Sequence, residues 1–172
     1  TGPGVANLIP GTLEAFSGCS PLVILCQSIS QKTEGMGDFQ ECDQLGMMRP
    51  ITKWAVRVND IDRLAWYVNR AFAIAMNDRP GPVFVEIPYD VGGDITHGLN
   101  VDITEPGYRV AVRHRTAGDP EMGTRAAEIL RRAERPLAIA GNGAILSGAG
   151  VAFRDLVEML GIPFLTTPGG RG

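Results

Sequence analysis

Hydrophobic residues recur at two different spacings along the chain, and these spacings predict its secondary structure. Between Val5 and Phe16, and again between Ile61 and Ala75, apolar side chains return every three or four residues, as in helices with one buried face. The continuous apolar run PLVILC, at Pro21–Cys26, is typical of a strand buried on both faces of a parallel sheet. The first half of the chain is therefore predicted to alternate helices and strands.

The rest of the chain follows the same rule. The sequence predicts strands at residues 54–58, 83–88, 136–141 and 162–167, helices at 122–133 and 153–160, and a loop at NGAILSG, residues 142–148. Asn59 and Asp60 are expected to cap the helix that begins near Ile61. This order predicts an α/β fold of mostly parallel sheets flanked by helices, built as two incomplete Rossmann-like units.

Local composition divides the chain into two domains. Gly, Asp, Pro and Arg dominate between residues 91 and 120 and no period persists there, which predicts a linker between domains at 1–90 and 121–172. The chain opens on TGPG without an initiator methionine and stops at TTPGGRG, directly after a predicted strand. We therefore expect it to be part of a longer polypeptide.

Overall composition excludes several classes of protein. A formal net charge of -3, with scattered Lys and Arg, is unlike a nucleic-acid-binding protein. We expect a cytoplasmic protein without membrane contact, because no apolar run approaches the roughly 18 residues of a membrane helix and no signal peptide is recognisable. Three cysteines without CxxC spacing, together with only His97 and His114, predict neither a disulfide framework nor a metal site.

The glycine-rich opening is the first place that could bind a ligand. Thr1, Gly2, Pro3 and Gly4 precede the first predicted helix, and Asn7 lies just inside it. Glycines let a ligand approach the main chain, and a helix N-terminus presents unpaired N–H groups to a polar or anionic group. The alternative interpretation is a glycine-rich turn that only leads into the helix.

A second candidate is GMGDFQECDQ, residues 35–44, which comes after the carboxyl end of a predicted strand, where open α/β sheets bind ligands. Asp38 and Glu41 have the spacing of a helix capping box, so they have a structural explanation. Phe39 and Gln40 do not, because a capping box needs neither an aromatic ring nor an amide.

The third candidate is AGNGAILSGAG, residues 140–150, in which Asn142 and neighbouring glycines come after a predicted strand. This order is typical of a nucleotide-binding turn, but the third glycine of that motif is not in place. No GxSxG, Walker or HExxH motif is present. Any catalysis by this protein is therefore predicted to depend on a bound cofactor.

Three blocks in this order resemble the pyrimidine-binding domain of thiamine-diphosphate (ThDP)-dependent enzymes of the acetolactate synthase, benzaldehyde lyase and pyruvate oxidase group. The blocks are TGPGVANLIPGTLEAFSGCSPLVILC, GMGDFQECDQLGMMRPITKWAVRV and NDRPGPVFVEIPYDV. The later segment ERPLAIAGNGAILSGAGVAFRDLVEMLGIPFLTT resembles the start of the same family's central domain. Residues 1–90 would then be the C-terminal part of the first domain, and 121–172 the start of the second.

The resemblance implies roles for particular residues. Thr1, Gly2, Pro3, Gly4 and Asn7 would border the aminopyrimidine of ThDP, bound between two subunits of a homodimer or homotetramer. Phe39 would form an apolar wall beside the thiazolium, and Gln40 would donate a hydrogen bond there. The substrate would be a 2-oxo acid or an aldehyde. Asn142 and its flanking glycines could line an FAD site, which only some members of the family have.

The resemblance also implies what this chain lacks. The family's catalytic glutamate and the GDG motif that holds Mg²⁺ and the diphosphate lie in parts of the family sequence that have no counterpart here. We therefore expect the 172 residues alone neither to bind ThDP tightly nor to turn over substrate. Two other functions stay open, namely an FAD- or nucleotide-binding module and an inactive structural fragment that associates through exposed apolar surface.

Overall fold

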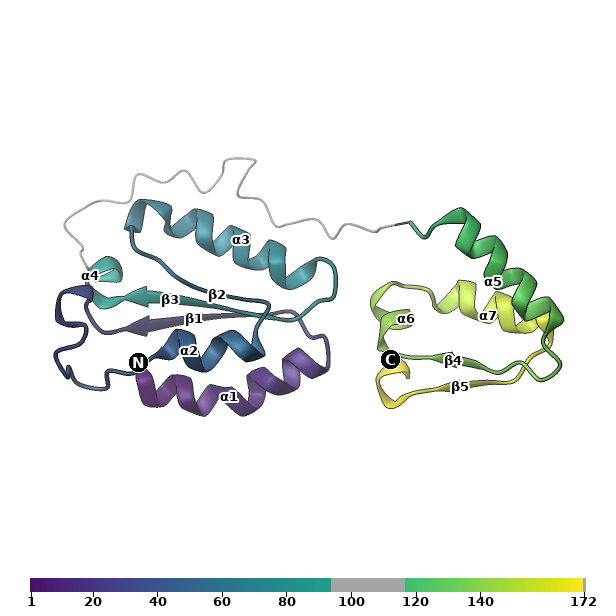
Figure 1. The fold of residues 1–172 in the computed structure, drawn as a ribbon, viewed down its shortest axis with the longest axis horizontal. Helices are drawn as coiled ribbons and strands as arrows, with labels where there is room; N and C mark the ends of the chain where they lie inside the picture. Colours follow the sequence, from purple (N-terminus) through teal and green to yellow (C-terminus); the bar gives the residue numbers. More distant parts are fainter. Residues whose placement is uncertain (94–116, 172) are drawn as a thin grey trace. The chain divides into compact units, whose positions relative to one another are not determined.

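The computed structural model describes residues 1–93 and 117–171, and the chain divides into two compact units, Thr1–His114 and Arg115–Gly172 (Figure 1). The first unit contains, in order, α1 (Gly2–Ser17), β1 (Leu22–Ser28), η1 (Gln31–Thr33), α2 (Gln44–Met48), η2 (Arg49–Ile51), β2 (Trp54–Arg57), η3 (Ile61–Arg63), α3 (Leu64–Met76), β3 (Pro82–Pro88) and α4 (Tyr89–Gly92). The second contains α5 (Pro120–Arg132), β4 (Ala138–Ala140), α6 (Asn142–Leu146), α7 (Gly150–Leu160), β5 (Phe164–Thr166) and η5 (Pro168–Gly170).

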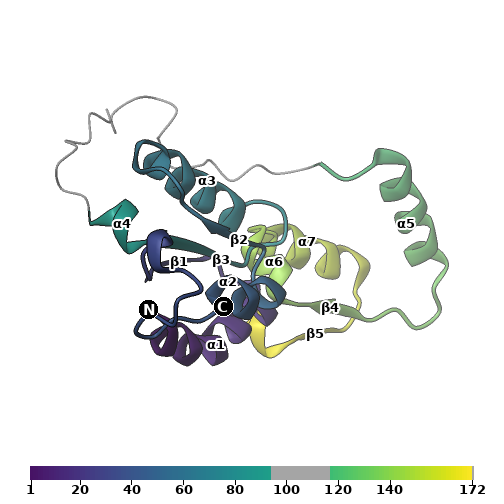
Figure 2. The same ribbon diagram turned by 60° about the vertical axis from the view of Figure 1, so that its left-hand side comes forward.

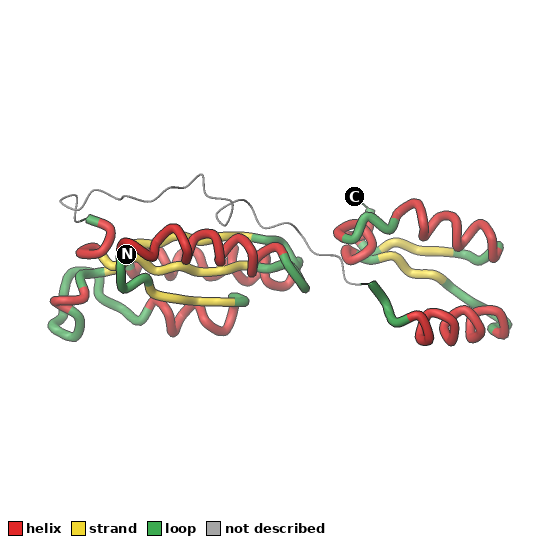
Figure 3. Tube along the Cα trace, turned by 90° about the horizontal axis from the view of Figure 1, so that it is seen from above, coloured by secondary structure: helices red, strands yellow, loops and turns green. Residues whose placement is uncertain are grey.

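The sheet of the first unit is parallel and has the strand order β1-β3-β2. Figure 1 shows the sheet between α3 on one face and α1 with α2 on the other, and Figure 3 shows the same unit from above. The second unit has a parallel pair, β4 and β5. The predicted α/β class with parallel sheets flanked by helices is thus confirmed, and every predicted strand is present to within about two residues at either end.

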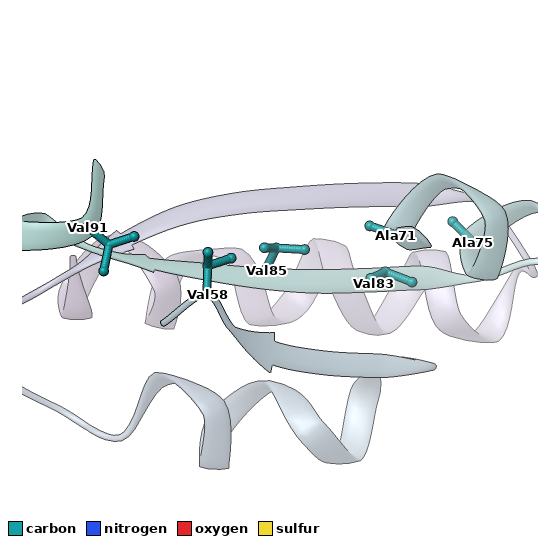
Figure 4. Packing of buried hydrophobic residues seen from close by; sticks show 6 residues of the cluster. All are labelled: Val58, Ala71, Ala75, Val83, Val85 and Val91. Carbon is teal, nitrogen blue, oxygen red and sulfur yellow. The ribbon is translucent and has the colours of Figure 1, made fainter. Parts of the chain in front are cut away.

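Strand β3 builds the core on both faces of the first sheet. Its side chains alternate, so that Val83 and Val85 belong to the cluster packed under α3, whereas Phe84 belongs to the cluster packed against α1 and α2. Figure 4 shows Ala71 and Ala75 of α3 on the same side of the sheet as Val83 and Val85, with Ala71 above Val83 and Val85 farther along the strand. The small alanine side chains let the helix approach the sheet closely.

The prediction that the strand at Pro21–Cys26 is buried on both faces was wrong. In the described chain, β1 pairs with β3 alone, and Leu22 and Leu25 are 39% and 52% exposed. The strand buried on both faces is β3, because it is central and has a neighbour on each side. An apolar run therefore identified a strand correctly but did not identify its place in the sheet.

Helices start earlier, or occur more often, than the sequence predicted. Helix α1 begins at Gly2 rather than after a glycine-rich loop, because Pro3 falls in the first turn, where its missing N–H costs no hydrogen bond. The predicted loop NGAILSG instead contains α6, and α2 begins at Gln44 rather than directly after Asp38, where the capping-box spacing would have started a helix. Both are five-residue helices, too short to show a hydrophobic period. The predicted cap is confirmed for the short helix η3, since Asp60 accepts a hydrogen bond from the Asp62 N–H at 3.0 Å, whereas α3 follows Arg63 without a side-chain cap.

The second unit can be traced in Figure 2. It buries fewer of its apolar side chains than the first unit. Phe153 of α7 meets Phe164 of β5 edge to face, with ring centroids 5.9 Å apart. Leu137, Ile139 and Leu165 remain more than half exposed. The predicted linker at 91–120 lies largely outside the described residues, as do His97 and His114. No helix in the described ranges is both long and apolar enough to cross a membrane.

Candidate functional site

The carboxyl end of the first sheet gathers segments that are far apart in the sequence. Figure 1 shows the N-terminus of the chain at the same end of the sheet as the arrowheads of β1 and β3. The segment that joins β1 to α2, residues 29–43, begins at this end of the sheet and carries Phe39 and Gln40. We call residues 31–43 the site loop. Parallel α/β sheets bind ligands at this edge.

The first turn of α1 lies directly against the site loop. The Thr1 hydroxyl donates a hydrogen bond to the Gln40 amide oxygen. A Cβ placed on Gly2 would lie 2.5 Å from the Gln40 carbonyl oxygen and 2.7 Å from the Cys42 Sγ, so only glycine fits at this position. The structure thus brings Gln40 together with Thr1 and Gly2, residues that the sequence separates by almost forty positions.

Gln40 has an unusual backbone conformation. Its φ of 62° is in the left-handed region, which a non-glycine residue adopts at a cost of roughly 1–2 kcal/mol. Such strain persists only where surrounding contacts enforce it, and it is concentrated at functional sites. Because Thr1 occupies the amide oxygen of Gln40, the amide N–H₂ is the group left to donate to a ligand. The neighbouring Phe39 ring is 82% exposed.

Of the other predicted site residues, Pro3, Gly4 and Asn7 lie on α1, whereas Asn142 belongs to the second unit. Pro3, Gly4 and Asn7 are exposed residues of α1, with Pro3 and Gly4 in its first turn. Asn142 is the first residue of α6, where a Cβ on Gly169 would come within 3.2 Å of the Asn142 Cβ. The second unit also has a mainly apolar cavity of about 380 Å³ lined by residues of α6, α7 and β5, but Asn142 is not among them.

The site loop folds around the carboxylate of Glu41. Its two oxygens accept hydrogen bonds from the N–H groups of Gly35, Gly37 and Asp38, at 2.5, 2.9 and 3.1 Å. These bonds, first of all the one from Gly35, hold the pKa of Glu41 below its ordinary value. The Thr33 hydroxyl, and after it the Phe39 N–H, likewise lowers the pKa of Asp38.

The capping-box interpretation of Asp38 and Glu41 was half correct. Glu41 does accept from the Asp38 N–H, as the third residue of such a box does, but no helix begins after Asp38. The next helix, α2, begins at Gln44 and is capped by Asp43, whose side chain accepts from the Gly46 N–H at 2.7 Å. The Asp38–Glu41 contact therefore shapes a loop.

A buried charge lies behind the site loop, and the sequence analysis did not identify it. Glu86 of β3 is 1% exposed, and its Oε1 lies 3.2 Å from the Nη2 of Arg57 on β2. The Nη1 of Arg57 is 2.8 Å from both carboxylate oxygens of Glu34 in the loop. The signal that could have revealed this network was a glutamate inside the otherwise apolar run VFVEIP.

Between Glu86 and the site loop is a cavity of about 220 Å³, which Gln40, Glu41, Arg57 and Glu86 help to line. Within the described chain, Glu86 Oε2 and Arg57 Nε are buried without a hydrogen-bond partner, which is the situation that ordered water usually relieves. Partial burial of its thiol, and after it the nearby Glu86 carboxylate, raises the pKa of Cys42. No group of three or more metal-ligating His, Cys, Asp or Glu side chains occurs in residues 1–93 and 117–171.

Two domain families match this chain. Residues 1–47 match the thiamine pyrophosphate enzyme N-terminal TPP binding domain, and residues 124–172 match the thiamine pyrophosphate enzyme central domain. Together these two ranges cover more than half of the chain, and they fall in the first and second structural units respectively.

Curated relatives align along the entire chain. A probable acetolactate synthase large subunit of Methanocaldococcus jannaschii is 35% identical over 176 aligned positions, a 2-hydroxyacyl-CoA lyase of Oryza sativa is 35% identical over 185, and an acetolactate synthase of Arthrospira platensis is 34% identical over 174. The chain spans 29%, 31% and 30% of these three proteins. With both family domains matched in the order in which the two structural units occur, the chain belongs to the thiamine pyrophosphate (ThDP)-dependent enzymes.

Proposed function

We propose that this chain forms part of a ThDP-dependent enzyme that makes or breaks a carbon–carbon bond next to a carbonyl group, with a 2-oxo acid as substrate and an acetolactate synthase-like reaction. The observation that carries the proposal is the contact between the first turn of α1 and Gln40, which is held in a left-handed conformation at the carboxyl edge of the sheet. The relatives named as acetolactate synthases and 2-hydroxyacyl-CoA lyases support the same class of chemistry.

The residues at this edge suit the cofactor. The missing Cβ of Gly2 lets the loop lie against the helix, and the N-terminus of the 16-residue α1 presents N–H groups to a polar ring. When bound, ThDP supplies a carbanion that attacks a carbonyl carbon and an electron sink for the resulting charge. Thr1, Gly2, Pro3, Gly4 and Asn7 would border its aminopyrimidine.

Phe39 and Gln40 would act on the substrate side of the cofactor. The exposed Phe39 ring offers an apolar surface that excludes water from the reacting carbonyl. The Gln40 amide, fixed through its oxygen by Thr1, would donate a hydrogen bond to the carbonyl or carboxylate oxygen of the substrate. Mg²⁺ would be held with the diphosphate by residues outside this chain.

The test uses the complete polypeptide that the gene encodes. ThDP and Mg²⁺ are titrated by calorimetry, and pyruvate consumption is assayed with the cofactor bound. Gln40→Ala should lower kcat/KM by about 100-fold, the usual cost of removing one hydrogen-bond donor to a developing charge. Gln31→Ala, an exposed amide in the same loop, is the matched control and should leave kcat/KM unchanged. Absence of ThDP binding by the complete polypeptide would refute the proposal.

Product analysis distinguishes carboligation from cleavage by a lyase. Formation of acetolactate from pyruvate would support carboligation, whereas cleavage of a 2-hydroxyacyl-CoA, with no reaction of pyruvate, would assign the chain to a lyase. A flavin absorption band in the purified protein would add FAD, for which Asn142 is the candidate contact. The predicted homodimer or homotetramer is checked by sedimentation, and the cytoplasmic location by fractionation of cells.

A further inference from the structure

Thr1 contacts Gln40 directly, but the first part of the site loop is held to the rest of the unit by other contacts. Its internal bonds, from Glu41 to three backbone N–H groups and from Thr33 to Asp38, fix its shape but not its position relative to the sheet. Two contacts join the first part of the loop to other elements of the first unit. One is the 3.0 Å hydrogen bond from the Gln31 N–H to Asp90 of α4, and the other is the ion pair between Glu34 and Arg57.

The Arg57 contact is the one with an anchor inside the sheet. Glu86 lies in the central strand β3, in register with Arg57 on β2 and Cys26 on β1. Burial of an unpaired carboxylate costs several kcal/mol, so Glu86 requires a cation, and Arg57 provides it. Arg57 in turn is held on β2, whose position is set by its pairing with β3.

The two terminal nitrogens of the Arg57 guanidinium contact different carboxylates. Nη2 reaches inward to buried Glu86, while Nη1 reaches outward to Glu34, whose side chain is 50% exposed. One guanidinium therefore joins the middle of the sheet to the site loop six residues before Gln40. Arg57 and Gln40 also line the same cavity of about 220 Å³, so a shift of the loop at Glu34 changes the wall to which Gln40 belongs.

We infer that Arg57 is a positioning residue, which holds the site loop through Glu34 and thereby sets the place of Gln40 against Thr1 and Gly2. The consequence for catalysis rests on the proposed role of Gln40. The effect on the loop itself does not depend on that role.

The ion pair between Arg57 and Glu34 can be removed without disturbing the ion pair between Arg57 and Glu86. Arg57→Met would leave Glu86 buried without a cation, and loss of activity could then reflect unfolding. Glu34→Ala keeps the Arg57–Glu86 pair and removes only the contact to the loop. Glu34→Gln keeps a hydrogen-bond acceptor and should restore part of the effect. Lys32→Gln changes one charge in the same loop outside the Arg57 ion pairs, and it serves as the matched control.

The first readout is amide hydrogen exchange in the complete polypeptide. Glu34→Ala should speed the exchange of residues 35–41 about threefold, as expected for the loss of a partly exposed ion pair, with unchanged exchange in β1 and β3. Glu34→Gln should show a smaller change and Lys32→Gln none. Unchanged exchange in the loop of Glu34→Ala, or equal acceleration in β3, would overturn the inference.

The second readout is a double-mutant cycle on kcat/KM. If Glu34 acts through Gln40, then Glu34→Ala should reduce kcat/KM in the parent protein but cause no further reduction in Gln40→Ala. Independent, additive losses would overturn the positioning role. If the complete polypeptide binds no ThDP, the proposed function fails, while the exchange experiment still decides whether Arg57 and Glu34 hold the loop.

Discussion

The two units of the chain differ in how their sheets are covered. In the first unit, β3 lies between β1 and β2 with helices over both faces, and ten of the twelve buried apolar residues of the described chain belong to this unit. In the second unit only Ala140 and Val157 are buried apolar residues within the described range, and both strands carry exposed side chains such as Ile139 and Phe164.

This difference explains why the candidate site lies on the first unit. A loop can hold Gln40 in a strained conformation only if the elements that carry its anchors do not move. Thr1 and Gly2 lie at the start of α1, which packs through Val5 against Ile24 and Phe84. Arg57 extends from a strand paired with β3. The strands that support Asn142 bury much less surface, so the same precision is not expected there.

The largest expected effect tests the difference in core packing directly. Phe84→Ala should destabilise the first unit by about 3–5 kcal/mol, because Phe84 is fully buried in β3. Phe164→Ala should cost the second unit about 1 kcal/mol, since Phe164 is 55% exposed. Amide exchange in β3 and in β4 reports the two units separately. Equal losses in both units would mean that the described contacts do not determine their stability.

An intermediate effect is expected where α1 meets the site loop. Gly2→Ala places a methyl group 2.5 Å from the Gln40 carbonyl oxygen, so the loop must shift, at a cost of about 1–3 kcal/mol. Gly4→Ala, two residues along the same helix and with nothing within 4 Å, should instead stabilise it by about 0.5–1 kcal/mol. Thermal unfolding of both variants measures the two changes in stability. A neutral Gly2→Ala would show that the helix and the loop are not in close contact.

The smallest effect is the response of the site loop to acid. The pKa values of Asp38 and Glu41 are lower in the folded protein than their ordinary values, so their ionised forms stabilise the loop. That contribution is complete above the ordinary carboxylate range of about pH 4–4.5 and is lost as pH falls through the depressed pKa values. The protection of residues 35–41, taken relative to the intrinsic exchange rate at each pH, should therefore fall in acid before that of β1. Glu41→Gln should remove most of this pH dependence.

Sequence periodicity determined the strands, the main helices and the α/β class of this protein, because each depends on side chains close together in the chain. The sequence also offered Thr1, Gly2 and Gln40 as candidate site residues. Thr1 and Gly2 belong to a glycine-rich segment, and a helix capping box gives Gln40 no role.

Tertiary structure decided what depends on distant neighbours. Strand order made β3, not β1, the strand buried on both faces. The hydrogen bond from Thr1 to Gln40, and the link from Glu86 through Arg57 to Glu34, join residues separated by 23 to 39 positions. Local patterns carry no information on such contacts, since these arise only when the strands pair and bring their carboxyl ends to one edge of the sheet.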